Sequence, residues 1–244
     1  MKKHVSVIML LCKTKLKGFA ATLAAMAVLS VAGYKIFFAG EEDFVSGYAG
    51  LFLRIVFSAA FVCCALSCLL LGGKKSEFGY SLQRLRISEQ GVYAWDCAIN
   101  SVLFILLWLS EAVIVYFLAR GFAGSAEYNM GPQYLIIRFY GNDFLHALIP
   151  MKETLILLRN FIFMISAGMV CAYVSLASRY RGRKNAYGWM GVPAIIIGRF
   201  PLSLGDEIII FSVIVIGFTA ASLYCALVTA HGGKGRNEDE EFVS

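Results

Sequence analysis

The sequence predicts an all-α polytopic integral membrane protein with six transmembrane helices, and three observations support this fold class. Hydrophobic residues make up 59% of the 244 residues, and the mean hydropathy is +0.71. Charged residues make up only 16%, against about 25% in a typical soluble domain. The apolar residues also gather in runs close to the roughly 20 residues that a membrane-spanning helix needs. We therefore expect a single transmembrane domain over residues 1–230.

Six apolar runs are the predicted spans, and the fifth differs from the others. The runs are Gly18–Phe38, Leu51–Leu71, Ala98–Ala119, Thr154–Ser178, Gly188–Leu204 and Glu207–Ala230. The fifth run is the shortest, and it contains Pro193, Gly198, Arg199 and Pro201. Because proline interrupts helices, we expect this span to be partly re-entrant. Six spans place both termini on one side of the membrane.

The lysine and arginine residues predict which side this is. With six spans, 15 of them fall on the side of the termini and 7 on the other. Cytoplasmic loops carry the basic excess in membrane proteins, so both termini are expected in the cytoplasm and the protein in the cell membrane. The net charge of +6 thus reflects topology first and attraction to anionic lipid second. No basic patch lies on a predicted soluble fold, so nucleic-acid binding is not expected.

The two ends of the chain are predicted to lie outside the bilayer core. Residues 1–17 contain a short apolar stretch but no small-residue cleavage site, so an interfacial helix is favoured over a cleaved signal peptide. The face of this helix that enters the lipid is expected to carry Val5, Ile8, Met9 and Cys12. Residues 231–244 change from glycine-rich to acidic and are expected to form a disordered cytoplasmic tail.

The second external segment, residues 120–153, is much longer than a helix connection needs. Its apolar content predicts two short helices on the outer surface, separated at Gly141–Asp143 with Asn142 or Asp143 as a cap. A lid that packs on neighbouring helices is favoured, and a gate or substrate-contacting cap is the alternative. The segment carries His146, for which a structural role is favoured over that of a pH-sensitive gate.

The cytoplasmic segment 72–96 is basic and partly amphipathic. Phe78, Leu82 and Leu85 share one face of a predicted short helix, and Ser88 is the predicted cap of the next helix. The third membrane helix should therefore begin near Glu89, before the bilayer. Such a segment can transmit a push into the membrane, and a basic connector lying on anionic lipid is the alternative.

This arrangement resembles the permease subunits of ABC-2-type transporters. Those subunits have an N-terminal interfacial helix, six spans, a coupling helix between spans two and three, and a broken region near span five. The matching segments are Tyr80–Ser88 (YSLQRLRIS) and the break at Pro193–Pro201. Phe144–Pro150 (FLHALIP) and Arg179–Lys184 (RYRGRK) also resemble segments of uncharacterised membrane proteins of Gram-positive bacteria.

The resemblance implies a membrane-spanning permease subunit of an ABC-type exporter. Its partners would be an ATP-binding cassette subunit, which hydrolyses the ATP, and a second permease subunit in a homo- or heterodimer. Phe78, Leu82, Leu85 and Arg86 would form the contact with the ATPase. In keeping with a separate ATPase, no GxxxxGK[ST] loop is found in the sequence.

Ionisable residues within the spans are candidate functional residues because they are costly in lipid. Glu111 lies a little past the middle of the third predicted span and is expected to face the protein interior. Arg54 and Arg159 are candidates to neutralise it, although extension of either side chain toward the lipid headgroups is favoured.

Two other classes of protein are alternatives to a permease. An intramembrane enzyme needs clustered histidines, paired acids or a nucleophile with a base, and none of these sets is complete, so no enzymatic activity is expected. Cys64 and Cys68 share a helix face but have no evident third ligand, so neither a metal site nor a cofactor is expected. An accessory, immunity or sensor protein bound to a transporter remains the main alternative.

Overall fold

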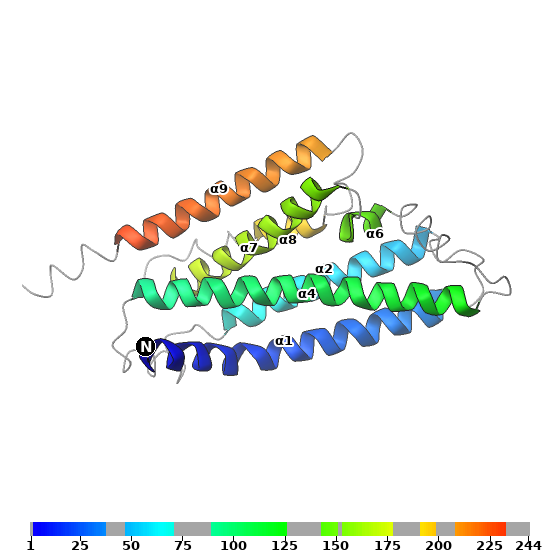
Figure 1. Ribbon diagram of the computed structural model, residues 1–244, viewed down its shortest axis with the longest axis horizontal. Helices are drawn as coiled ribbons and strands as arrows, with labels where there is room; N and C mark the ends of the chain where they lie inside the picture. Colours follow the sequence, from blue (N-terminus) through cyan, green and yellow to red (C-terminus); the bar gives the residue numbers. More distant parts are fainter. Residues whose placement is uncertain are drawn as a thin grey trace, which may run out of the picture.

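The computed structural model describes residues 2–37, 47–70, 89–125, 143–150, 153–177, 191–198 and 208–232. These residues form the helices α1 (Lys2–Phe37), α2 (Gly47–Leu70), α4 (Glu89–Ser125), α6 (Asp143–Leu148), α7 (Thr154–Ala177), α8 (Gly191–Gly198) and α9 (Ile208–Gly232) (Figure 1). No strand occurs among the described residues. The all-α prediction is confirmed for this part of the chain.

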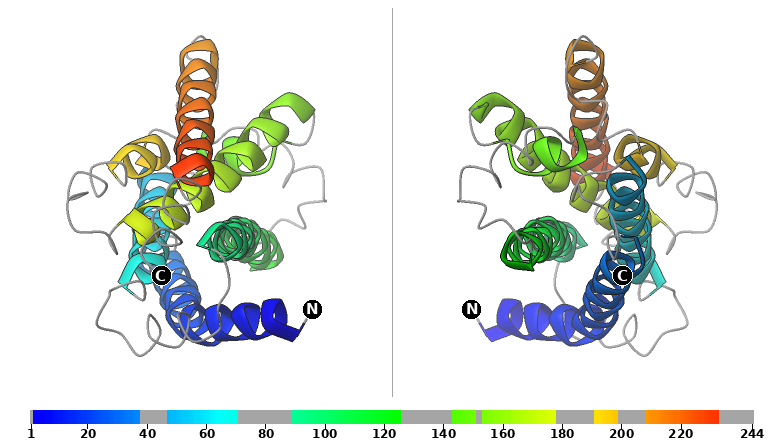
Figure 2. Two further views of the ribbon diagram at one scale, coloured as in Figure 1. Left: turned by 90° about the vertical axis from the view of Figure 1, so that its left-hand side faces the viewer. Right: turned by 90° about the vertical axis from the view of Figure 1, so that its right-hand side faces the viewer.

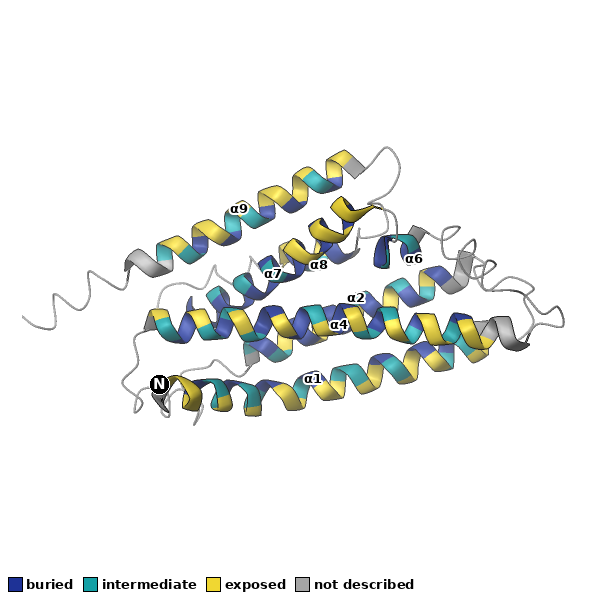
Figure 3. Cartoon of the chain, viewed as in Figure 1, coloured by how far each residue is buried: buried dark blue, intermediate teal, exposed yellow. Residues whose placement is uncertain are grey.

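Five helices in the described part of the chain, α1, α2, α4, α7 and α9, are long and apolar enough to cross a membrane. They coincide with five of the six predicted spans and indicate a multi-pass membrane protein. The third of these helices, α4, begins at Glu89, as predicted. Figure 3 shows that exposed residues follow the outer faces of the helices, and large apolar side chains such as Leu155 and Ile209 are among them.

The predicted fifth span, Gly188–Leu204, is not a spanning helix in the described residues. Only α8 is described there, and its eight residues extend over about 12 Å, well short of the roughly 30 Å hydrocarbon core. Pro193 does not interrupt this helix, because it lies in the first turn, where a backbone N–H is not needed. The rest of the range lies outside the described residues.

The predicted interfacial segment, residues 1–17, is continuous with the first membrane helix in α1. Figure 2 shows that the N-terminal part of α1 runs at an angle to the remainder. In this part, Val7 and Leu11 are buried against Val92 of α4. Val5 and Met9, which were expected to enter the lipid, are exposed to 54% and 68% and are free of that helix contact.

Close helix contacts define how α1, α2 and α4 run. A Cβ atom on Gly18 would meet Ser67, and one on Gly33 would lie 2.0 Å from the Phe52 ring. The later glycine of α1 thus contacts the earlier residue of α2, so the two helices are antiparallel. Small residues at such crossings allow membrane helices to approach closely. Helix α4 runs in the same direction as α1 (Figure 1).

Helices α7 and α9 run parallel to each other. The Arg159 side chain donates to Ser212 Oγ at 3.3 Å, and Ser166 Oγ donates to Thr219 Oγ1 at 3.0 Å. Both contacts join residues 53 positions apart, which is the mark of a parallel pair in constant register. The end of α7 and the beginning of α9 therefore lie at opposite ends of the bundle (Figure 1).

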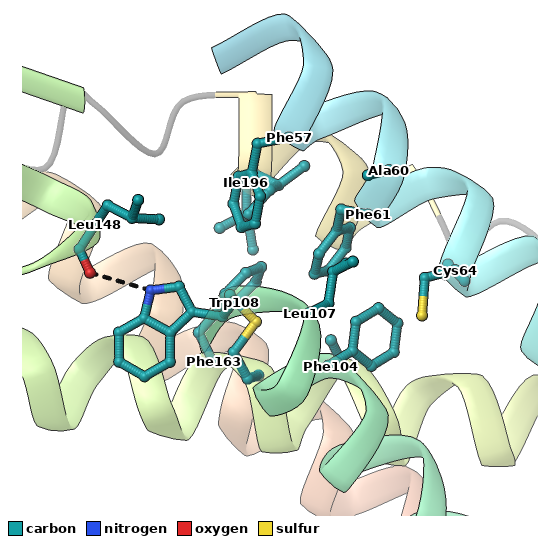
Figure 4. Close-up of a cluster of buried hydrophobic side chains, with 14 of the residues drawn as sticks. Phe57, Ala60, Phe61, Cys64, Phe104, Leu107, Trp108, Leu148, Phe163 and Ile196 are labelled. Atoms are coloured by element: carbon teal, nitrogen blue, oxygen red, sulfur yellow. Dashed lines mark hydrogen bonds between the residues drawn. The ribbon is translucent and has the colours of Figure 1, made fainter. Parts of the chain in front are cut away.

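The apolar core lies between α2, α4, α7 and α8 (Figure 4). The Phe61 ring of α2 lies 4.7 Å from the Phe104 ring and 5.9 Å from the Phe163 ring, centroid to centroid. Ile196 of α8 is also buried in this cluster. Phe61 thus joins three helices at the centre of the bundle, while α8 closes one side of it.

Candidate functional site

The four residues predicted to contact an ATPase, Phe78, Leu82, Leu85 and Arg86, lie outside the described residues. The structure begins again at Glu89, directly after this segment, with the first turn of α4. What can be described is the part of the bundle to which the segment is joined. The remaining predicted site residues, Glu111, Arg54, Arg159 and His146, all lie on described helices.

Glu111 lies on the buried face of α4, with Leu107 and Val115 one turn before and after it. All three side chains are 0% exposed. Neither carboxylate oxygen of Glu111 has a hydrogen-bond partner among the described residues. The side chain therefore faces the protein interior, and no described residue forms a hydrogen bond with its carboxylate.

Arg159 is buried in the bundle, where its contacts are with α7 and α9. Its side chain is 8% exposed and its guanidinium carbon lies 4.8 Å from the centre of the Phe211 ring. The guanidinium donates to Ser212 Oγ and to Asn160 Oδ1, both at 3.3 Å. It is held inside the bundle because α9 supplies both an aromatic face and a hydroxyl acceptor. Arg54, on α2, is half-buried.

Helix α6, part of the segment that was predicted to form a lid, packs on neighbouring helices at the end of the bundle. Phe144 lies 6.0 Å from Phe57 of α2, centroid to centroid. Trp108 Nε1 donates to the Leu148 carbonyl at 3.1 Å (Figure 4), and Asn160 Nδ2 donates to the Ala147 carbonyl at 2.9 Å. Three spanning helices thus fix α6. The first of the two predicted external helices lies outside the described residues.

His146 is the half-buried residue of α6, while its neighbours Leu145 and Ala147 are buried. Its backbone position is fixed by the contacts of α6 with α2, α4 and α7. These contacts account for the position of His146, and its role stays a prediction.

A buried polar cluster between α1 and α4 was not predicted. Lys15 Nζ forms an ion pair with Asp96 Oδ1 and donates to Asn100 Oδ1 at 2.5 Å. The exposed fractions of the Lys15 and Asp96 side chains are 3% and 7%. Asn100 Nδ2 in turn donates to the Gly168 carbonyl of α7 at 3.5 Å. The cluster joins three helices near the end of the bundle at which α4 begins.

The sequence does contain a signal for this cluster. Val7, Leu11 and Lys15 recur every four residues and therefore share one face of a helix. Asp96 and Asn100 share a face of the next helix but one in the same way. A lysine on an apolar face opposite an acid on a long helix is a pattern for a buried ion pair. The cluster can be predicted only if α1 and α4 are known to be neighbours, and the sequence does not show this.

The Gly168–Ser101 contact draws α4 and α7 together beside this cluster. A Cβ atom on Gly168 would lie 2.5 Å from the backbone nitrogen of Ser101. Ser101 Oγ donates to the Ile165 carbonyl at 3.2 Å. The polar cluster and the close crossing thus occupy one region of α4, and they fix its position relative to α1 and α7.

The cysteines of the described residues are free thiols, and Cys64, Cys68, Cys171 and Cys225 are buried. Among the described residues, no three His, Cys, Asp or Glu side chains gather as a set that could hold a metal ion. Cys64 packs with Phe61 and Phe104 in the apolar core (Figure 4). Small apolar packing accounts for its position.

Comparison of the chain with family models, with curated proteins and with solved structures gives no match in any of the three.

Proposed function

We propose that the chain is a permease subunit of an ABC-type exporter, driven by an ATP-binding subunit that docks on residues 77–88. The observation that carries this proposal is the way α4 begins. Its first residue, Glu89, directly follows the basic amphipathic segment, and the helix then continues without a break for 37 residues to Ser125. A displacement of that segment would act on one end of α4, a continuous helix that enters the membrane.

The length of α4 supports this role. A helix of 37 residues extends over about 55 Å, whereas the hydrocarbon core is about 30 Å thick. Part of α4 therefore reaches beyond the core unless the helix is strongly tilted. The Lys15–Asp96 ion pair lies less than ten residues after Glu89, so the projecting part is attached to α1 as well. A push on α4 would be shared with α1.

The parallel arrangement of α7 and α9 supports six crossings. Both helices run from the same end of the bundle, as their two contacts at a separation of 53 residues require. The chain between Ala177 and Ile208 has to return from one end to the other. Helix α8, which packs on α2 and α9, lies within this return. Such an arrangement fits the broken fifth span of the permease family, and an even number of crossings would put both termini on the same side of the membrane.

The experiment is co-purification of the tagged full-length chain from its native membrane in mild detergent, with partners identified by mass spectrometry. We expect an ATP-binding subunit to copurify with the wild-type chain. In the variant Leu82→Asp/Leu85→Asp, two carboxylates enter the apolar face, and we expect loss of the ATP-binding subunit while the chain remains in the membrane.

The matched control is Gln83→Asp/Arg84→Gln. It lowers the net charge by two, as the test variant does, but changes residues off the apolar face. We expect it to retain the partner. An ATP-binding subunit retained by the Leu82/Leu85 variant would contradict the docking site. A chain that purifies alone, or with membrane partners that bind no ATP, would favour the accessory class.

A further inference from the structure

Glu111 is a titratable side chain that the proposed function leaves without a role. It is 0% exposed, and neither of its oxygens meets a hydrogen-bond partner among the described residues. An ionised carboxylate in apolar surroundings is costly unless an opposite charge or several donors balance it. The question is what balances the charge of Glu111 in this arrangement of helices.

The register of the helices identifies the residues at the level of Glu111. On α1, Lys15 contacts Asp96, 81 positions further along the chain. Beyond Lys15 the two helices run in the same direction, so Ser30, also 81 positions before Glu111, lies at about its level. On α2, Phe61 faces Phe104 in an antiparallel pair, which brings Arg54 to the same level. Ser30, Arg54 and Glu111 thus occupy one layer.

The side chains of this layer do not neutralise Glu111. Ser30 is 0% exposed, and its hydroxyl group carries no charge. No hydrogen bond joins Arg54 to either oxygen of Glu111.

The neighbouring elements do not supply the charge either. On α7, Arg159 is directed to Ser212 and Asn160. On α6, His146 forms no hydrogen bond with Glu111. A proton can balance the charge because it binds directly to the carboxylate oxygen and needs no cavity.

We propose that Glu111 is a proton-binding site: its carboxyl group holds a proton at neutral pH while α1, α2 and α4 are packed as in this structure. When the layer opens to water, the O–H bond breaks and the proton passes from Glu111 to a water molecule, which leaves a carboxylate. Arg54, at the same level on α2, is then a cationic side chain with which the carboxylate can pair. This inference concerns the packing of the bundle and does not depend on the proposed function.

Infrared spectroscopy of the full-length chain in lipid nanodiscs tests the proposal, because the carbonyl stretch of a protonated carboxylic acid is separate from the bands of a carboxylate. We expect this band in the wild-type chain at neutral pH and its absence from Glu111→Gln. Glu153→Gln is the matched control, because Glu153 is exposed at the start of α7. It should retain the band.

The pH dependence of stability gives a second readout. If the folded chain binds a proton that the unfolded, water-exposed carboxyl group releases, stability falls as pH rises. We expect the wild-type Tm to decrease from mildly acidic to mildly alkaline buffer, and the Tm of Glu111→Gln to decrease less. Glu153→Gln should follow the wild type.

Two outcomes would overturn the proposal. The first is a wild-type chain whose acid band is missing at neutral pH and develops only in acid, as for an exposed carboxyl group. The second is a band that is present in choline buffer and abolished by sodium at the same pH, since a metal cation would then be the ligand. Both are measured on the wild-type chain, so they remain decisive if a variant fails to fold.

Discussion

Lys15 of α1 and Asp96 of α4 form an ion pair that is enclosed by the bundle although the two residues lie 81 positions apart. Asn100 completes the cluster by accepting a second hydrogen bond from Lys15 Nζ and by contacting α7. The pair therefore attaches the N-terminal part of α1 to the beginning of α4. It is the described feature that most directly connects the beginning of α4, which follows the segment before Glu89, to a second helix.

Removal of one partner of this pair should be costly. Asp96→Ala leaves the Lys15 ammonium buried without its carboxylate, and loss of one partner of a buried pair costs about 3–5 kcal/mol. We expect a large decrease in Tm, measured by thermal unfolding in detergent. Lys15→Met/Asp96→Leu removes both charges and should lie much closer to the wild type. A double variant as unstable as Asp96→Ala would contradict this account. Lys17→Ala, at an exposed position of α1, is the control.

The Gly168–Ser101 crossing should tolerate no side chain. In Gly168→Ala the new Cβ atom would lie 2.5 Å from the backbone nitrogen and 2.7 Å from the Cα atom of Ser101, so α4 and α7 must separate. Overpacking of this kind costs about 1–3 kcal/mol, and we expect a lower Tm.

Gly217→Ala on α9 is the control, because it is the same substitution at a position where we expect no loss of stability. Nothing lies within 4 Å of the added Cβ atom, and alanine is favoured over glycine in a helix by about 0.5–1 kcal/mol. The Tm should be unchanged or slightly higher. If both variants lose the same stability, the close approach of α4 and α7 is wrong.

The parallel register of α7 and α9 predicts a specific disulfide. The side-chain oxygens of Ser166 and Thr219 are 3.0 Å apart, so Ser166→Cys/Thr219→Cys should form a cross-link on mild oxidation, detected as a linked peptide by mass spectrometry. Ser166→Cys/Ser212→Cys should not form a cross-link. Ser212 lies two turns before Thr219 on α9, about 10 Å away along the helix axis, which is beyond the reach of a disulfide. Cross-linking of the second pair in place of the first would indicate a shifted register.

The attachment of α6 to α4 depends on one indole N–H group. Trp108→Phe removes the donor to the Leu148 carbonyl, at a cost of about 1 kcal/mol, and should accelerate hydrogen exchange of the α6 amides. In the control, Trp95→Phe, the lost hydrogen bond joins Trp95 to His4 at the exposed end of α1, and exchange in α6 should not change. Equal protection of α6 in the wild type and in Trp108→Phe would mean that other contacts hold this helix.

The spans could be predicted because each apolar run has the length of a membrane-crossing helix. The beginning of α4 at Glu89 was also predictable, because a serine that is suited to cap a helix is followed by an acid in the sequence. The predicted fifth span does not correspond to one described helix, since α8 is too short to cross the membrane. The apolar run that contains α8 does not indicate where a helix begins or ends. Ile196 of α8 is buried in the core, a contact that apolar composition alone does not reveal.

The polar interactions between helices could not be predicted in the same way. Extension toward the headgroups was the favoured interpretation for Arg159, because a single sequence does not reveal that α9 places Ser212 and Phe211 beside it. The Lys15–Asp96 pair was hidden for a similar reason. Lys15 was counted as one of many cytoplasmic basic residues, and only the contact of α1 with α4 gives it a partner.

The claim on which the proposed function depends most is that the chain between α7 and α9 returns across the membrane, which gives six crossings. The direct test is the location of both termini, measured with reporters fused to residue 1 and residue 244 that are active on only one side of the membrane. We predict that both termini lie in the cytoplasm. A cytoplasmic N-terminus with a C-terminus on the outer side would mean an odd number of crossings and would contradict the account.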